Sequence, residues 1–373
     1  MTTPAFNSRA FELVWPRWIA AAEIDRLMAL NATGRTHDWA EQCTLFLTEA
    51  FTSAEIADKF EGMSGWTPWE PEKQSQASWL DDLRTNLDDC PTKGERMPYW
   101  SARRGASRQT SKTDLPATCR RFASLVARLD DAGYFASAMG QPCVDDSTIG
   151  SLGTFPIEEL HRQLGREGGL WPVQRFGEHY DLDDLCDVIE FLADHVRRPT
   201  RRHYHSYSNC GWHYDEFDSE RGQQLYRSEV NVLLAESEIG LMLAESGRLE
   251  MVAPGVVEEL VTAVRAAENV HDADDMELEH ALSQFRVRGA SPMDRRQSVI
   301  ALAGILERRR ALIKTHLLSK DEGALFQIAN QFGIRHQDAK QQTEYDSELY
   351  LEWIFYWYVA TINLTNKIAA AQV

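Results

Sequence analysis

The chain has 373 residues, more than one hydrophobic core usually supports, which predicts two or three domains. Hydrophobic residues make up 43% and charged residues 26% of the chain, as in ordinary globular proteins, so the composition excludes wholesale disorder. The net charge of −18 opposes nonspecific nucleic-acid binding, because such binding needs an excess of Lys and Arg. Any nucleic-acid contact would have to be local.

The cysteine pattern and the chain start predict a cytoplasmic protein. Six cysteines are scattered singly without a Cys-x-x-Cys pair, which argues against a disulfide framework and against a four-cysteine zinc site. The first residues do not resemble a signal peptide. The apolar segment 349–364 is interrupted by Glu352, so we interpret it as a buried helix and expect no membrane association.

The N-terminal half predicts helices separated by irregular segments. Apolar residues recur at helical spacing over 8–62, and again over 117–135. The stretch 91–116 is polar and without periodicity, as is typical of a loop, and 139–181 is rich in Gly and Pro. Asp181 is expected to open a helix that ends near Arg197, just before Pro199.

The C-terminal part predicts a helical bundle. Helical patterns cover residues 223–247, 254–268, 274–286, 293–318, 320–331 and 345–370. Alternating strand-like segments are hard to find anywhere in the chain. We therefore expect an all-α fold, with a C-terminal bundle behind a mainly helical and partly irregular N-terminal half. The expected regions are 1–115, 116–200, a His- and Tyr-rich connection 201–222, and 223–373.

The connection carries four side chains that are able to bind zinc, His203, His205, Cys210 and His213. Their spacing matches no established zinc pattern, and a single loop rarely supplies every ligand of an ion. The favoured interpretation is a polar elbow whose side chains hydrogen-bond the loop backbone. We therefore expect no metal and no cofactor.

A second group of candidates lies on the segment 297–318. Arg310 falls on the same apolar stripe as Val299 and Leu306, so its guanidinium needs a partner. The favoured interpretation is a packed stem with its head in an interhelix salt bridge. Arg309 and His316 are seven residues apart and share a face of the predicted helix.

A third group lies in a polar turn near the C-terminus, where Asn330, Arg335 and His336 follow an apolar segment. Histidine exchanges protons near neutral pH, and Arg binds phosphate, so these groups suit a metal-independent ribonuclease. The alternative is structural: Arg335 and His336 would cap helix carbonyls and pair with Asp338 or Asp346.

The sequence runs Met293–Arg310, Leu325–His336 and Trp353–Ile362 resemble the C-terminal helical region of uncharacterised bacterial proteins. That region in turn resembles HEPN domains, the helical modules of abortive-infection and antiviral proteins and of toxin ribonucleases. The resemblance implies an all-α homodimer that cleaves RNA without metal. It assigns His336 as general acid or base, Arg335 or Arg310 as phosphate clamp and Asn330 as orienting donor, with His316 as an alternative histidine.

The chain departs from the HEPN pattern of an Arg and a His with four to six residues between them. Arg335 directly precedes His336, and the spacing is met by Asn330 with His336, by Arg309 or Arg310 with His316, and by Arg198 with His203. A degenerate domain that only binds RNA therefore stays open. The competing hypothesis is a noncatalytic helical interaction protein whose acidic surface binds a protein partner, for example another component of a defence system.

Overall fold

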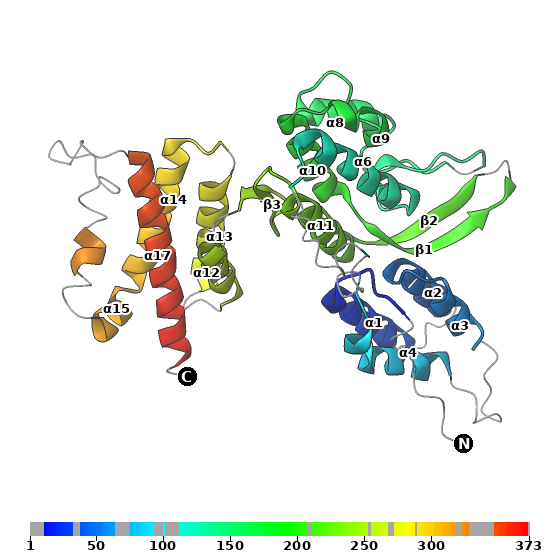
Figure 1. Cartoon of the computed structure of the whole chain (residues 1–373), viewed down its shortest axis with the longest axis horizontal. Coiled ribbons are helices and arrows are strands. Elements are labelled where there is room, and N and C mark those ends of the chain that lie inside the picture. Colours follow the sequence, from blue (N-terminus) through cyan, green and yellow to red (C-terminus); the bar gives the residue numbers. More distant parts are fainter. Residues whose placement is uncertain are drawn as a thin grey trace. The chain divides into compact units, whose positions relative to one another are not determined.

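The fold is that of a computed structural model, which describes residues 11–32, 38–63, 75–92, 100, 112–145, 147–207, 210–252, 255–267, 272–287, 289–317, 323–327 and 347–371. Helices dominate this part of the chain, and its strands form two antiparallel two-stranded sheets. The chain divides into two compact units (Figure 1). Unit 1 comprises residues 1–239 and 245–247, and unit 2 comprises 240–244 and 248–373.

Unit 1 contains the following helices and strands, in chain order. They are α1 (Arg17–Ala32), α2 (Trp39–Ala50), α3 (Glu55–Glu61), α4 (Gln76–Thr85), η2 (Leu87–Asp89), α6 (Leu115–Asp131), α7 (Ala136–Met139), α8 (Pro156–Leu164), α9 (Val173–Phe176), η4 (Gly177–His179), α10 (Leu182–His195), β1 (Arg198–His205), β2 (Gly211–Asp218) and α11 (Ser219–Ala235).

Side-chain caps begin several helices of unit 1, and the cap at Asp181 lies where the sequence predicts a helix start. The Asp181 side chain accepts a hydrogen bond from the Asp184 backbone at the start of α10, and Asp114 does the same for Ala117 at the start of α6. The chain leaves α10 at Val196, near the predicted end. It then enters β1, where Pro199 is tolerated because β1 is an edge strand.

The hairpin β1–β2 is the main departure from an all-α fold. Its two strands lie side by side (Figure 1). The register pairs His203 with His213, Tyr204 with Trp212 and His205 with Gly211. The sequence does not reveal this hairpin because β1 carries Arg, His and Tyr in place of alternating aliphatic residues, and because register shifts interrupt its pairing between Pro199 and Arg202. With polar and aromatic side chains at most positions, β1 lacks the apolar–polar alternation that identifies a strand in a sequence.

A buried ion cluster joins β1 to the N-terminal helices. Arg198 is 1% exposed, and it donates hydrogen bonds to Glu23 of α1 and Glu49 of α2, both at 2.8 Å. Arg26 also donates to Glu23, at 2.8 and 2.9 Å. The Arg198 guanidinium lies 4.9 Å from the centre of the Trp15 ring. The start of the hairpin is therefore fixed by the fully buried pair of Arg198 and Glu23 and by partly buried partners around it.

The boundary between the units lies near residue 240, whereas the sequence places the start of the C-terminal bundle at 223. The difference arises because α11 packs on α6, α10 and β1 of unit 1. The predicted helix 223–247 is also too long. After Ala235 the chain turns at Gly240, which has a φ of +70°, and forms the strand β3 (Leu241–Leu243).

Unit 2 is a helical bundle with one short hairpin. Its further elements are β4 (Leu249–Met251), α12 (Gly255–Ala266), α13 (Asp272–Arg286), α14 (Pro292–Arg308), α15 (Arg310–His316) and α17 (Ser347–Ala370). The helix α17 packs along α14 and against α12 (Figure 1). Phe355 of α17 stacks on Phe285 of α13 with ring centres 3.8 Å apart. The segment 345–370 is thus a core helix of its bundle, as predicted.

Two details of unit 2 correct the sequence prediction. Trp353 is 53% exposed, so α17 is not buried on every side, although Trp357 packs against the core. The predicted helix 293–318 breaks at Arg309, which is buried and donates to Asp274 at 2.9 Å and to Thr365 at 2.8 Å. The break turns the guanidinium inward, so Arg309 is the buried arginine of this segment in place of Arg310.

Candidate metal centre

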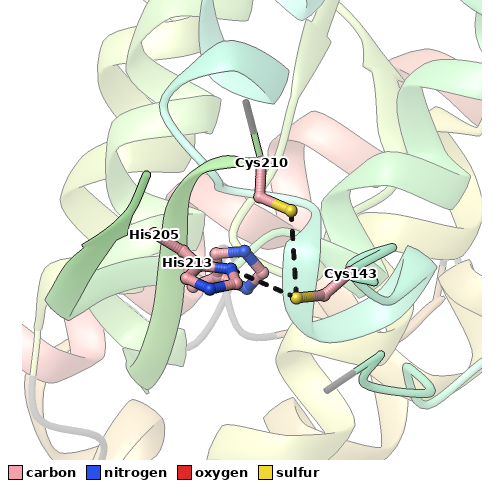
Figure 2. A group of neighbouring side chains, drawn as sticks. All are labelled: Cys143, His205, Cys210 and His213. Carbon is pink, nitrogen blue, oxygen red and sulfur yellow. Dashed lines mark hydrogen bonds between the residues drawn. The ribbon is translucent and has the colours of Figure 1, made fainter. Parts of the chain in front are cut away.

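Four side chains from two parts of unit 1 converge beside the hairpin. They are Cys143, His205, Cys210 and His213, and their candidate ligand atoms all lie within 4.8 Å of one another. Figure 2 shows the two sulfurs and the two imidazoles pointing toward a common centre. His213 is buried and the other three are half-buried. Such a closed group of nitrogen and sulfur donors is the ligand set that zinc prefers.

The hairpin supplies three of the four side chains. His205 is the last residue of β1, Cys210 directly precedes β2, and His213 is the third residue of β2. Side chains two residues apart in a strand lie on one face, so His205 shares a face with His203, whose cross-strand partner is His213. Gly211 has a φ of +87°, a conformation that lets the chain turn sharply between Cys210 and β2.

The fourth side chain comes from a loop that is docked on β2. The side-chain amide of Gln141 donates to the Tyr214 carbonyl and accepts from the Tyr214 amide, both at 2.8 Å. The backbones of Gln141 and Thr148 form an antiparallel bridge, and Ser147 accepts from the Cys143 amide at 3.0 Å. These bonds close the loop and hold Cys143 beside the hairpin.

Tyr214 also anchors β2 to the end of helix α6. Its hydroxyl donates to the Asp131 carbonyl at 3.0 Å, and burial raises its pKa, so the hydroxyl keeps its proton. A Cβ atom at Gly133 would collide with the Tyr214 ring, and Gly133 has a φ of +82°. Glycine is therefore required where the end of α6 meets the hairpin.

The distances within the cluster suit tetrahedral zinc. The Cys143 and Cys210 sulfurs are 4.0 Å apart, and Cys143 Sγ lies 3.4 Å from His205 Nδ1 (Figure 2). Zinc bonds of about 2.3 Å to sulfur and about 2.05 Å to nitrogen separate two sulfurs by about 3.8 Å and a sulfur from a nitrogen by about 3.6 Å. For these two pairs of atoms, a shift of a few tenths of an ångström would bring the side chains to tetrahedral geometry.

The second nitrogen of His205 also has a partner of the type that metal sites use. His205 Nε2 lies 3.4 Å from a carboxylate oxygen of Asp145, in the same loop as Cys143. A carboxylate behind a metal-binding histidine fixes the orientation of the ring and the position of its proton, and it makes the ligand more basic. The Nδ1 atom is thereby left to face the Cys143 sulfur, 3.4 Å away.

This geometry corrects the interpretation of residues 201–222 as an elbow that binds its own backbone. His205, Cys210 and His213 converge, but His203 does not join them, because its Nδ1 pairs with Asp215 Oδ2 at 3.0 Å. Cys143 was missed because it lies 62 residues before His205. The signals available in the sequence were the closely spaced His205, Cys210 and His213, and a single cysteine in the Gly- and Pro-rich segment 139–181.

The residues expected to act on RNA do not form a comparable cluster within the described residues. Asn330, Arg335 and His336 lie outside the described residues. Arg310 and His316 both belong to α15, but a separation of six residues places them about 120° apart around a helix. Arg310 also lies over the Phe326 ring, with 4.3 Å between guanidinium and ring centre, and 3.4 Å from Glu307. The Arg310 and His316 side chains are therefore not aimed at one point.

The remaining arginines with the HEPN spacing form buried ion pairs within the fold. Arg309 and Arg198 are both buried in ion pairs, with Asp274 and with Glu23 and Glu49 respectively. Neither is available to hold a phosphate.

Comparisons of the chain with protein-family models, with curated proteins and with solved structures found no match. Within the described residues, the longest and most apolar helices still fall short of what a membrane crossing requires.

Proposed function

We propose that unit 1 binds one zinc ion through Cys143, His205, Cys210 and His213. The observation that carries this proposal is the convergence of two sulfurs and two imidazoles, from segments far apart in sequence, within 4.8 Å. Four protein ligands fill a tetrahedral zinc site and leave no position for substrate or water. The ion would therefore act as a structural centre and would not take part in catalysis.

The structural role follows from what the ion would connect. An isolated two-stranded hairpin is marginally stable at best, and β1–β2 has no further strand beside it within the described residues. Zinc would tie its tip to the loop of Cys143, in addition to the bonds between Gln141 and Tyr214. We infer that the chain is a zinc-stabilised binding protein whose hairpin presents a surface to a partner. This inference agrees with the hypothesis of a noncatalytic interaction protein.

Elemental analysis of the purified protein should find about one zinc per chain, because four ligands define one tetrahedral site. The Cys143→Ser and His213→Ala variants should lose most of this zinc. His203→Ala is the matched control: it removes a histidine from the same hairpin, outside the cluster, and should keep the ion. Zinc-free protein with intact, reduced cysteines that also takes up no added zinc would refute the proposal.

Asp145→Ala provides a graded test of the same site. The variant keeps all four ligands but loses the carboxylate behind His205. Loss of such a partner typically weakens metal binding by about 10-fold to 100-fold, so competition with a chromogenic chelator should show this reduction. An unchanged affinity would mean that Asp145 does not orient the ligand.

A bacterial antiviral or abortive-infection role, with RNA binding or metal-independent cleavage by the C-terminal region, is a separate proposal that rests on the HEPN resemblance. In this proposal His336→Ala abolishes cleavage of RNA by the purified protein with little change in melting temperature, because an exposed catalytic group contributes little to stability. A capping histidine would instead cost about 1 kcal/mol of stability when removed. Absence of cleavage by the unaltered protein would remove the enzymatic version.

A further inference from the structure

A groove of about 870 Å³ lies in unit 1 between the helices α2 and α3 and the strand β1. One wall comes from helix residues such as Glu41, Thr44 and Asp58, and the other from the residues between Thr200 and Tyr204, with Trp212 of β2. The groove is separate from the zinc ligands, none of which lines it. Its volume is in the range of sites that hold a sizeable ligand.

Two large aromatic side chains stand exposed at this groove. Tyr204 is 57% and Trp212 47% exposed, and the two are cross-strand neighbours with ring centres 5.2 Å apart. The guanidinium of Arg202 lies 4.1 Å from the centre of the Trp212 ring. Exposed tyrosine and tryptophan beside each other are common anchors of binding surfaces, since each offers an apolar body and a polar tip.

The charges around the groove favour a cationic ligand. Glu41, Asp58 and Glu61 line the helical wall, and all three are exposed. On the strand wall, Arg201 is surrounded by three further carboxylates at 3.5 to 3.7 Å, those of Asp38, Asp215 and Glu216. The carboxylates therefore outnumber Arg201 and Arg202. A polyanion would meet net repulsion here, whereas Lys and Arg side chains would find ion pairs.

The shape of the strand wall favours an extended ligand. Strand β1 is an edge strand, because its sheet contains only β1 and β2. Within the described residues, the backbone of β1 makes no hydrogen bonds to other backbone groups except those with β2. An edge strand that lines a groove can pair with an added strand, so that main-chain bonds supply affinity and side-chain contacts supply selectivity.

We propose that this groove binds an extended, Lys- and Arg-rich peptide segment of a protein partner. The peptide backbone lies along β1, its basic side chains face Glu41, Asp58 and Glu61, and its apolar or basic stems cover Tyr204 and Trp212. This inference rests on the binding role proposed above and names the chemistry of the partner.

The test uses the full-length protein with its zinc content measured in the same sample, so that loss of the metal and failure of the groove are distinguished. Fluorescence anisotropy compares three labelled probes: a peptide of about ten residues that alternates Lys and Thr, the same peptide with Glu in place of Lys, and a single-stranded RNA of similar length. The basic peptide should bind, and its affinity should fall with added salt. The acidic peptide should not bind.

Variants then locate the site. Neutralising the helical wall with Glu41→Gln, Asp58→Asn and Glu61→Gln together should weaken binding of the basic peptide by about tenfold, because three partly screened ion pairs are lost. Tyr204→Ala should weaken it as well, because it removes an aromatic contact of the groove. The matched control removes three exposed carboxylates elsewhere in unit 1, through Asp88→Asn, Asp89→Asn and Glu178→Gln, and should bind as the unaltered protein does.

Three outcomes would overturn the proposal for zinc-loaded protein. These are stronger binding of the RNA than of the basic peptide, an equal loss of affinity in the groove and control triple variants, and no binding of the basic peptide at low salt. The first would assign the groove to single-stranded nucleic acid. The second would show that the basic peptide responds to the net charge of the chain and not to the carboxylates of the groove. If the protein contains no zinc and also does not bind the basic peptide, the result contradicts the proposed zinc site and not the groove.

Discussion

Chelation of zinc should lower the melting temperature of the protein and expose the hairpin β1–β2 to hydrogen exchange. A ligand that binds only the folded state stabilises it by about 4 kcal/mol when its free concentration is a thousand times its dissociation constant. Structural zinc commonly binds tightly enough to reach this regime. The predicted loss is therefore large, and exchange mass spectrometry should place it in the peptides that carry Cys143, His205 and His213.

The controls separate zinc loss from general damage by the chelator. The Cys143→Ser variant should already be destabilised and should respond little to chelation, whereas His203→Ala should behave as the unaltered protein. Acidification should also release the ion, because thiolates and neutral imidazoles are the forms that bind it, and both take up protons as the pH falls. A melting temperature that is the same with and without chelator would contradict a structural role for the cluster.

Replacement of Glu23 by Gln should destabilise unit 1 by about 3 kcal/mol or more, because a buried arginine is left without one of its counter-charges. Glu23 is fully buried and accepts hydrogen bonds from Arg198 and Arg26, while Arg221 lies 3.7 Å away. The remaining carboxylate near Arg198 is Glu49. Denaturant unfolding followed by far-UV circular dichroism measures the change in unfolding free energy.

Asp25→Asn is the matched control for this variant, since Asp25 lies on the same helix and pairs with Arg84. The pair is exposed, with side-chain exposures of 56% and 41%, so its loss should change stability by no more than about 0.5 kcal/mol. An equally small effect of Glu23→Gln would show that Glu49 alone compensates Arg198.

The same cluster predicts a pH dependence with a definite sign. Burial by itself would raise the pKa of Glu23, but Arg198, Arg26 and Arg221 more than offset it, so the pKa is lowered on folding. A lowered pKa means that the contribution of Glu23 to stability is complete above its unfolded pKa and is lost as the pH falls through its folded pKa. The difference in stability between the unaltered protein and Glu23→Gln should therefore shrink in acid.

Helices with strong local signals could be predicted from the sequence. The boundaries of α10 depend on Asp181 at one end and the approach to Pro199 at the other, and the aromatic segment 345–370 closely matches α17. Caps and apolar periodicity act within a few residues, so their effect can be recognised without knowledge of the fold. Helix ends that depend on distant partners, such as the break at Arg309, were not predictable in this way.

The candidate zinc cluster shows where local sequence is insufficient. Three of its side chains lie within nine consecutive residues and are recognisable as zinc-capable, but the sequence favours an elbow without metal, does not single out Cys143, and offers His203, which does not join the cluster. Residue type establishes which side chains can bind a metal. Which of them meet depends on the register of β1 with β2 and on the Gln141 side chain that docks a distant loop, and both are consequences of long-range packing. The composition, the helical periodicity and the caps are local properties of the chain, whereas a coordination sphere requires that separate segments be brought to within a few ångströms.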